Sequence, residues 1–528
     1  MSLKRTCRIS GKEFVITDDD LDFYEKISPV IGGEKFLIPP PTLCPDERLR
    51  RRLSWRGIYH LYRTKCAYSG KDIITFYPPN RPYKSTDQAI WWSDSVENLS
   101  CGRDYDDSKT FTEQFDSLLQ SAYLPCLSNS YVTNVNSDYV NGTDHLNNSY
   151  LVFNAKNSDN CEYSESVYYS QDIFDSYFVR ESDDCYDSVG IIRCHSSISL
   201  EESEDCRCVD FCYNMKGCSN CLLSFGQTNQ KFMIENIQYT ESTYFEEKKK
   251  YQDSFGGYNY NELKKLFHAM KERENIEKII NYNSENSTGN HLSNCSNVHF
   301  ATDIVESKNC KYVNTLGKAE DVFDCFSWGY SLENAYECVA VGTNASNIIG
   351  SYAVWTDTSS MYYSFSCFSC NHCFGCVGLK NKSYCIFNKE YLKEDWEMLV
   401  KKIIATMREN GEWGEYLNVE ISPWGYNETM ANLYFPMTRE EVLQMGYHWN
   451  DYEPSRPEAM KYVPASRLPE NIDEVPDDIQ NWAIECEISG KYYKITRPEL
   501  EFYRKHHLPI PKKHYDIRRK ERFERRFR

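Results

Sequence analysis

The stretch DCFSWGYSLENAYECVAVGTNASNIIGSYAVWTDTSSMYYSFSCFSCNHCFGCVGL, residues 324–379, decides the fold because a small residue recurs in it at a nearly fixed interval. The interval is 13 residues between the first four positions and 12 before the fifth, and these positions are Cys325, Cys338, Ser351, Ser364 and Cys376. Short β-prone pieces with polar corners at a fixed period are typical of stacked coils. We therefore expect these small side chains to stack as ladders inside a narrow solenoid.

Similar pieces begin much earlier in the chain, for example NSDNCEYSE at 157–165 and SEDCRCVDFC at 203–212. They predict a mainly β protein whose middle, residues 127–390, is a right-handed parallel β-helix with about two such units in each coil. The 41 tyrosines fit this prediction because aromatic side chains suit pleated surfaces. A charged amphipathic segment at 258–286 predicts a helix inserted into the solenoid.

The two ends of the chain repeat each other, since CRISGKEFVI at 7–16 matches CEISGKYYKI at 486–495. We expect a small zinc-ribbon-like α+β module and its connector over 1–126, and a truncated second copy over 481–528. Between the solenoid and that copy, 391–480 is expected to be a helical and Pro-rich wrapping segment.

The openings of these modules resemble a zinc knuckle, C-x-x-C-G, with Ser in place of the second Cys. Cys7 begins the first opening and Cys66 begins a third, partial copy, while Cys44 aligns with His514. Cys7, Cys44 and Cys66 are therefore candidate zinc ligands. The alternative is a ribbon-shaped fold that has lost its metal.

A second candidate metal site is the run CFSCNHCFGC, which contains Cys367, Cys370, Cys373 and Cys376. Thiolates two residues apart can converge on zinc or an iron–sulfur cluster. The alternative is that these thiols are buried rungs of the last coils. The cofactor expectation is therefore either no cofactor or zinc.

The net charge of −18 is unevenly distributed. Residues 44–66 carry +5 and residues 512–528 carry +6, so the rest of the chain sums to −29. Helical spacing places four arginines of each basic segment on one face. These candidate nucleic-acid-binding residues are Arg48, Arg51, Arg52, Arg56, Arg518, Arg522, Arg525 and Arg526. They suit phosphate contacts with RNA or a ribonucleoprotein, or ion pairs with the acidic solenoid.

Several motifs together resemble an uncharacterised family found in bacteria of the candidate phyla radiation. They include CPDERLRRRLSWR at 44–56, FTEQFDSLL at 111–119, CFGCVGLKNKSYCIFNKEY at 373–391 and GEWGEYLNVEISPWGYNET at 411–428. The resemblance implies zinc-ribbon-like ends and a Cys-rich solenoid middle, and it implies no activity. The serines of the knuckles depart from the paired cysteines of that family.

The function expected from these patterns is a non-enzymatic binding or scaffold protein that contacts RNA through its basic ends. The alternative is a carbohydrate-active β-helix enzyme, with acid pairs such as Asp183/Asp184 and Glu201/Glu202 in a solenoid groove. The first residues lack a signal-peptide pattern and no long apolar run occurs, so we expect a cytoplasmic chain with no membrane partner. In that compartment the 23 cysteines are expected to be mostly reduced.

Overall fold

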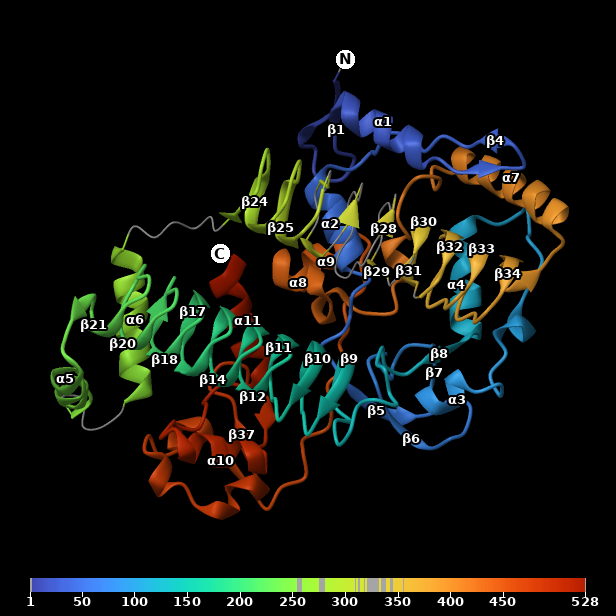
Figure 1. Ribbon diagram of the computed structural model, residues 1–528. Coiled ribbons are helices and arrows are strands. Elements are labelled where there is room, and N and C mark those ends of the chain that lie inside the picture. Colours follow the sequence, from blue (N-terminus) through green and yellow to red (C-terminus); the bar gives the residue numbers. More distant parts are fainter. Residues whose placement is uncertain are drawn as a thin grey trace. The chain divides into compact units, whose positions relative to one another are not determined.

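The computed structural model describes residues 2–253, 259–274, 281–308, 310–311, 314–317, 319–320, 332–333, 339–341, 345–354 and 356–527. The chain forms two compact units, each built from two segments. Unit 1 comprises Met1–Cys126 and Glu277–Tyr452, and unit 2 comprises Leu127–Ile276 and Glu453–Arg528. Each unit contains a parallel β-solenoid (Figure 1), so the protein is mainly β. The predicted solenoid region 127–390 is thus shared between the two units.

The solenoid of unit 2 is a stack of short strands followed by one returning strand. Its strands are β9 (Val140–Asn147), β10 (Val152–Asp159), β11 (Glu165–Tyr168), β12 (Gln171–Phe174), β13 (Tyr177–Arg180), β14 (Asp183–Tyr186), β15 (Val189–Ile192), β16 (His195–Ile198), β17 (Leu200–Glu204), β18 (Arg207–Asp210), β19 (Cys212–Tyr213), β20 (Ser219–Leu222), β21 (Lys231–Ile234) and β22 (Ile237–Gln238).

One coil of this solenoid contains 12 residues, because each strand pairs in parallel with the strand 12 residues later. Ile173 lies beside Cys185, and Cys185 lies beside Ser197. In unit 1 the step from Ser351 to Ser364 is a coil of 13 residues, in which the Ser364 amide donates to the Ser351 hydroxyl at 3.0 Å. The prediction of two 13-residue units per coil was therefore wrong, because each unit is a whole coil. Cys325 and Cys338 lie outside the described residues.

Every third residue from 152 to 224 points into the core and is buried. The residue before each inward residue has a positive φ, which turns the chain at four corners in each coil. Asn and Asp tolerate this left-handed backbone, but bulky residues such as Tyr169 (φ 54°) also adopt it here. The inward serines form ladders: the Ser188 amide donates to the Ser176 hydroxyl at 3.1 Å, and Ser176 Oγ donates to the Phe174 carbonyl at 2.9 Å.

The solenoid of unit 1 has the same construction in its described part. Its strands are β23 (Asn281–Tyr282), β24 (Thr288–Ser293), β25 (His299–Val305), β26 (Asn314–Gly317), β27 (Ala319–Glu320), β28 (Leu332–Glu333), β29 (Val339–Val341), β30 (Ser346–Ile349), β31 (Tyr352–Val354), β32 (Ser359–Tyr362), β33 (Asn371–Phe374), β34 (Ser383–Ile386) and β35 (Lys389–Glu390).

Both solenoids end in the same cap, an antiparallel two-residue hairpin followed by a helix. The hairpin turns contain Asn236 and Asn388, and the residue before each also has a positive φ, as a type I′ turn requires. Each of these asparagines accepts a hydrogen bond from the amide of the preceding coil at 2.8 Å, from Phe225 and Val377 respectively. The helices that follow are α5 (Glu241–Asp253) and α7 (Lys393–Glu409).

The remaining segments of unit 1 are small hairpins and helices. They are β1 (Leu3–Thr6), β2 (Glu13–Ile16), α1 (Asp18–Ile27), β3 (Val30–Ile31), β4 (Glu34–Lys35), α2 (Pro45–Leu53), β5 (Tyr62–Lys65), β6 (Asp72–Thr75), β7 (Lys84–Thr86), α3 (Gln88–Trp92), α4 (Phe111–Ser121), β8 (Tyr123–Pro125), α8 (Met430–Tyr434) and α9 (Arg439–Gln444). Buried Trp55 contacts Phe365 of the solenoid, with ring centroids 6.1 Å apart.

The terminal segment of unit 2 repeats the opening of unit 1, as the matched sequences predict. Its elements are β36 (Lys461–Pro464), β37 (Trp482–Glu485), β38 (Tyr492–Tyr493), α10 (Arg497–Lys505) and α11 (Tyr515–Phe527). In both copies a threonine capping box starts the first helix, at Thr17 and Thr496. The predicted register also holds, since Lys12 pairs with Asp46 at 3.4 Å and Lys491 pairs with Asp516 at 3.3 Å.

The predicted insertion at 258–286 is present as α6 (Tyr260–Arg273), although it is shorter and is followed by strand β23. The 21 cysteines in the described part of the chain are all free thiols, as expected for a reduced protein. None of the described helices combines the length and apolar character that crossing a bilayer requires.

Candidate functional site

The four candidate arginines of the second basic segment all lie on α11 and are directed into unit 2. Arg518 and Arg522 share the two oxygens of buried Asp175, and Arg522 Nη1 lies 2.7 Å from Asp175 Oδ1. Arg522 also donates to the Tyr163 carbonyl at 2.8 Å. Only 3% of Arg522 is exposed. These side chains fasten α11 to the solenoid.

The next two arginines continue the same contact toward the capped end of the solenoid. Arg525 Nη2 lies 2.7 Å from Asp187 Oδ1, and Arg526 Nη1 lies 2.8 Å from Glu202 Oε1. Burial would raise the pKa of Asp187, but Arg525 and Lys264 of α6 hold it well below its usual value. Asp187 therefore stays charged and ties both helices to one coil. We call the contacts of these four arginines with the solenoid carboxylates the arginine clamp.

The first basic segment is also buried, within unit 1. Arg48 and Arg52 lie on α2 and are 4% and 0% exposed. Arg51 pairs with Glu415 at 2.8 Å and donates to the Leu417 carbonyl at 3.2 Å. Arg56 is buried as well, but it lies beyond the end of α2, so the prediction that it shares that helix was wrong.

The acid pairs considered for catalysis serve as attachment points. Asp184 binds Lys505, the last residue of α10, at 2.6 Å, and His506, which follows the helix, at 2.7 Å. Glu201 receives Arg525 and also Lys271 of α6, and Glu202 receives Arg526. Asp183 is bonded to the Nδ1 atom of His195. These carboxylates are therefore engaged in holding helices and neighbouring coils.

The run Cys367, Cys370, Cys373 and Cys376 supplies the inward residues on the four sides of one coil, and all four are fully buried. Hydrogen bonding from the thiols of Cys367 and Cys373 lowers the pKa of Cys370. In the residues that the structure describes, no group of three or more His, Cys, Asp or Glu side chains is placed to hold a metal ion. The placement of the run matches the buried-rung alternative.

The knuckle cysteines Cys7, Cys44 and Cys66 are buried, and no group of metal-ligating side chains surrounds them in the part of the chain that the structure describes. Burial would raise the pKa of Cys7, but hydrogen bonds from Cys44 and Ser10 lower it to about 7. Ser10 Oγ lies 3.6 Å from Cys44 Sγ. Cys66 accepts from the Asp87 amide at 3.3 Å. Because a hydroxyl stands where a second thiolate would be needed, these sites do not fit zinc, and the zinc-ribbon expectation is not supported.

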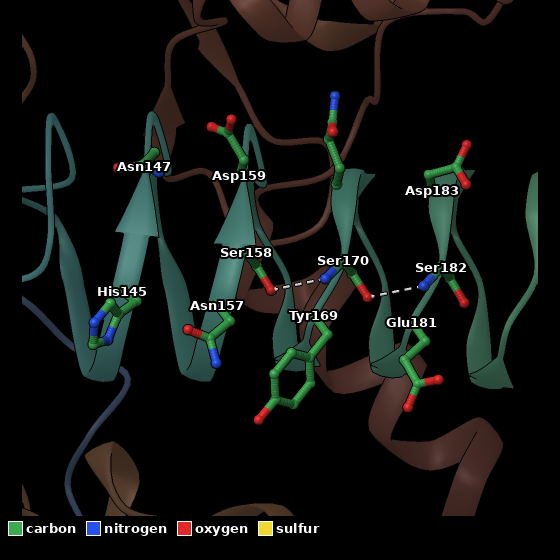
Figure 2. A pocket seen from close by; sticks show the side chains of 11 residues that line it. His145, Asn147, Asn157, Ser158, Asp159, Tyr169, Ser170, Glu181, Ser182 and Asp183 are labelled. Atoms are coloured by element: carbon green, nitrogen blue, oxygen red, sulfur yellow. Dashed lines mark hydrogen bonds between the residues drawn. The ribbon is translucent and has the colours of Figure 1, made fainter.

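One open side of the unit 2 solenoid is hollowed into a shallow depression of about 590 Å³, which we call the polar trough. Figure 2 shows its two rows of side chains with a serine ladder between them. One row is His145, Asn157, Tyr169 and Glu181, and the other is Asn147, Asp159, Gln171 and Asp183. Between the rows run Ser158, Ser170 and Ser182, which are buried and belong to the internal serine ladder. The Ser170 amide donates to Ser158 Oγ at 3.2 Å, and the Ser182 amide donates to Ser170 Oγ at 3.1 Å.

None of the residues of the polar trough except Asp183 was among the residues considered from the sequence. A signal was present, since His145, Asn157, Tyr169 and Glu181 recur at intervals of 12, but these side chains share no chemical type. No protein-family model matches the chain, and no curated protein matches it. The fold and the site thus define a capped β-solenoid protein with an internal arginine clamp and an open polar trough.

Proposed function

We propose that this protein is a non-enzymatic binding scaffold, in which a rigid solenoid presents one open side to a partner. The observation that carries this proposal is the placement of two features on one coil. In a 12-residue coil, positions six residues apart lie on opposite sides, and Asp175 of the arginine clamp follows Tyr169 of the polar trough by six. The clamp therefore occupies one side and leaves the opposite side open.

The clamp also bears on the expected RNA contact. All eight candidate arginines are buried or partly buried, and the four on α11 pair with carboxylates of their own unit. Binding of α11 to a phosphate backbone would require breaking the ion pairs of Arg518 and Arg522 with Asp175. This arrangement favours the alternative considered from the sequence, in which the arginines pair with the acidic solenoid. Partner binding is assigned to the open side instead.

The carbohydrate-active enzyme alternative requires free acid and base groups along a groove. In the polar trough, Asp183 is bonded to His195, and Glu181 pairs with Arg180 at 3.0 Å. These carboxylates are thus engaged by neighbouring side chains. Binding without bond cleavage is the function that this arrangement favours.

The test incubates the full-length protein with a panel of plant, fungal and bacterial polysaccharides and measures new reducing ends and unsaturated products. We expect neither above the level of a heat-denatured control. Product formation that is lost in Asp183→Asn would refute the scaffold proposal and support the enzyme alternative. A parallel measurement with single-stranded RNA tests the RNA expectation, and we expect weak binding that Arg522→Ala leaves unchanged.

A further inference from the structure

We propose that the polar trough binds an extended, uncharged, hydroxyl-rich polymer, namely a neutral polysaccharide chain lying along the solenoid axis. This inference rests on the proposed binding function and names the class of its ligand. Four features of the site favour such a ligand: its shape, its aromatic residue, its amides and its charge.

Tyr169 provides a stacking surface in the middle of one row of the trough. Its side chain is 55% exposed, and its neighbours in the row are Asn157 and Glu181, one coil away on either side. Successive coils are about 4.8 Å apart, as hydrogen-bonded strands are. The apolar face of a sugar ring packs on such an aromatic ring, while the flanking side chains reach its edge.

Amide side chains on both rows complement sugar hydroxyls, because an amide both donates and accepts hydrogen bonds. In the described part of the chain, no hydrogen bond within the protein engages the side-chain amides of Asn147 and Asn157. Gln171 lies opposite Tyr169 and donates only to its neighbour Asp172, at 3.2 Å. The trough therefore offers donors and acceptors in two parallel rows, as a chain of hydroxyls requires.

The charges of the trough favour a neutral polysaccharide over nucleic acids, acidic polysaccharides and polycations. Asp159, Glu181 and Asp183 make the site negative, which disfavours nucleic acids and acidic polysaccharides. The partners of Glu181 and Asp183, Arg180 and His195, already occupy two of these carboxylates. A polycation would have to displace these partners, whereas hydroxyl groups can donate to the carboxylate lone pairs that the partners leave free.

The test measures binding of the full-length protein to neutral hexasaccharides of glucose, xylose and N-acetylglucosamine by isothermal titration calorimetry. Hexalysine and a short single-stranded RNA serve as contrasting probes. We expect at least one neutral hexasaccharide to bind, and Tyr169→Asn to weaken it about tenfold through loss of the stacking surface. Asparagine tolerates the positive φ at this position, so the coil is kept.

The matched control is Tyr282→Asn, which removes a tyrosine that is 65% exposed in unit 1 and should leave the affinity unchanged. Asn157→Gly is the second trough variant. Glycine accepts the positive φ of this position, so the coil is kept, and loss of the amide should weaken binding several-fold. The proposal is overturned if no neutral hexasaccharide binds, if both trough variants bind as the wild type does, or if hexalysine or RNA binds the trough more tightly. Binding accompanied by cleavage would instead refute the scaffold function while leaving the ligand class intact.

Discussion

Replacing Arg522 with alanine should destabilise unit 2 without changing any affinity for RNA. Arg522 is buried and joins α11 to both Asp175 and the Tyr163 carbonyl. Removing one partner of a buried ion pair costs roughly 3–5 kcal/mol, and we expect about 3 kcal/mol because Arg518 still compensates Asp175. For a unit of this size, each kcal/mol lowers Tm by roughly 2–4 °C, so the shift should be about 6–12 °C.

Differential scanning calorimetry on the full chain measures this shift, and hydrogen exchange of α11 localises it. Lys520→Ala is the matched control, since Lys520 is on the same helix but exposed, and it should change stability by less than about 0.5 kcal/mol. RNA affinity is measured over a salt series for both variants. An unchanged Tm together with weaker RNA binding and a salt slope flatter by about one unit would refute the clamp and restore the RNA interface.

Three further predictions concern other parts of the fold. Burial raises the pKa of Glu499 to about 7, so the folded state retains a proton that the unfolded state loses near pH 4.5. The free energy of unfolding should therefore fall as the pH rises from 4.5 to 7. Urea titrations from pH 4.5 to 7.5 measure this fall, and Glu499→Gln should flatten the pH profile. Asn388→Ala removes a fully buried side chain that bonds Val377 and should destabilise unit 1 by about 2–3 kcal/mol in thermal unfolding. A Tm equal to that of the wild type would contradict a stabilising role of the hairpin cap. Ser176→Ala removes one hydroxyl of the serine ladder and should lower the free energy of unfolding by about 1–2 kcal/mol. Ser176→Cys should lower it less, because cysteines occupy other inward positions. Equal losses in urea unfolding would show that the hydroxyl does not contribute.

The sequence predicted the solenoid because the small residues of residues 351–376 recur at one phase of the coil. Ser351, Ser364 and Cys376 do stack in a ladder, since the Ser364 amide donates to the Ser351 hydroxyl and the Cys376 amide donates to the Ser364 hydroxyl. The sequence did not reveal that one 12- or 13-residue unit is a whole coil. The inward positions recur every third residue, and they are occupied by both polar serine and apolar residues such as valine or cysteine. Hydropathy therefore does not follow the period, and only the backbone corners make it visible.

The candidate sites were predicted less well than the fold. The helical spacing of Arg518 and Arg522 was right, but a sequence contains no information on whether an arginine faces solvent or a distant carboxylate such as Asp175. The alignment of Cys44 with His514 was also right in register, yet ligand types at matching positions do not make a metal site without a complete set. Whether such a residue binds a ligand or a distant residue of its own chain depends on the fold, and residue type alone does not reveal it.

The hairpin caps have a consequence for assembly. A parallel ladder has an unpaired edge at its last coil, onto which a coil from a second molecule could add, and such addition repeats without limit into a fibre. In both units the last coil is paired with a strand that runs backward, and the following helix lies over it: Trp396 donates to the Cys385 carbonyl at 3.3 Å. The hairpin caps therefore prevent the solenoids from adding further coils end to end. Removing the chain from Ile237 or Lys389 onward would expose an unpaired edge that could start fibre formation.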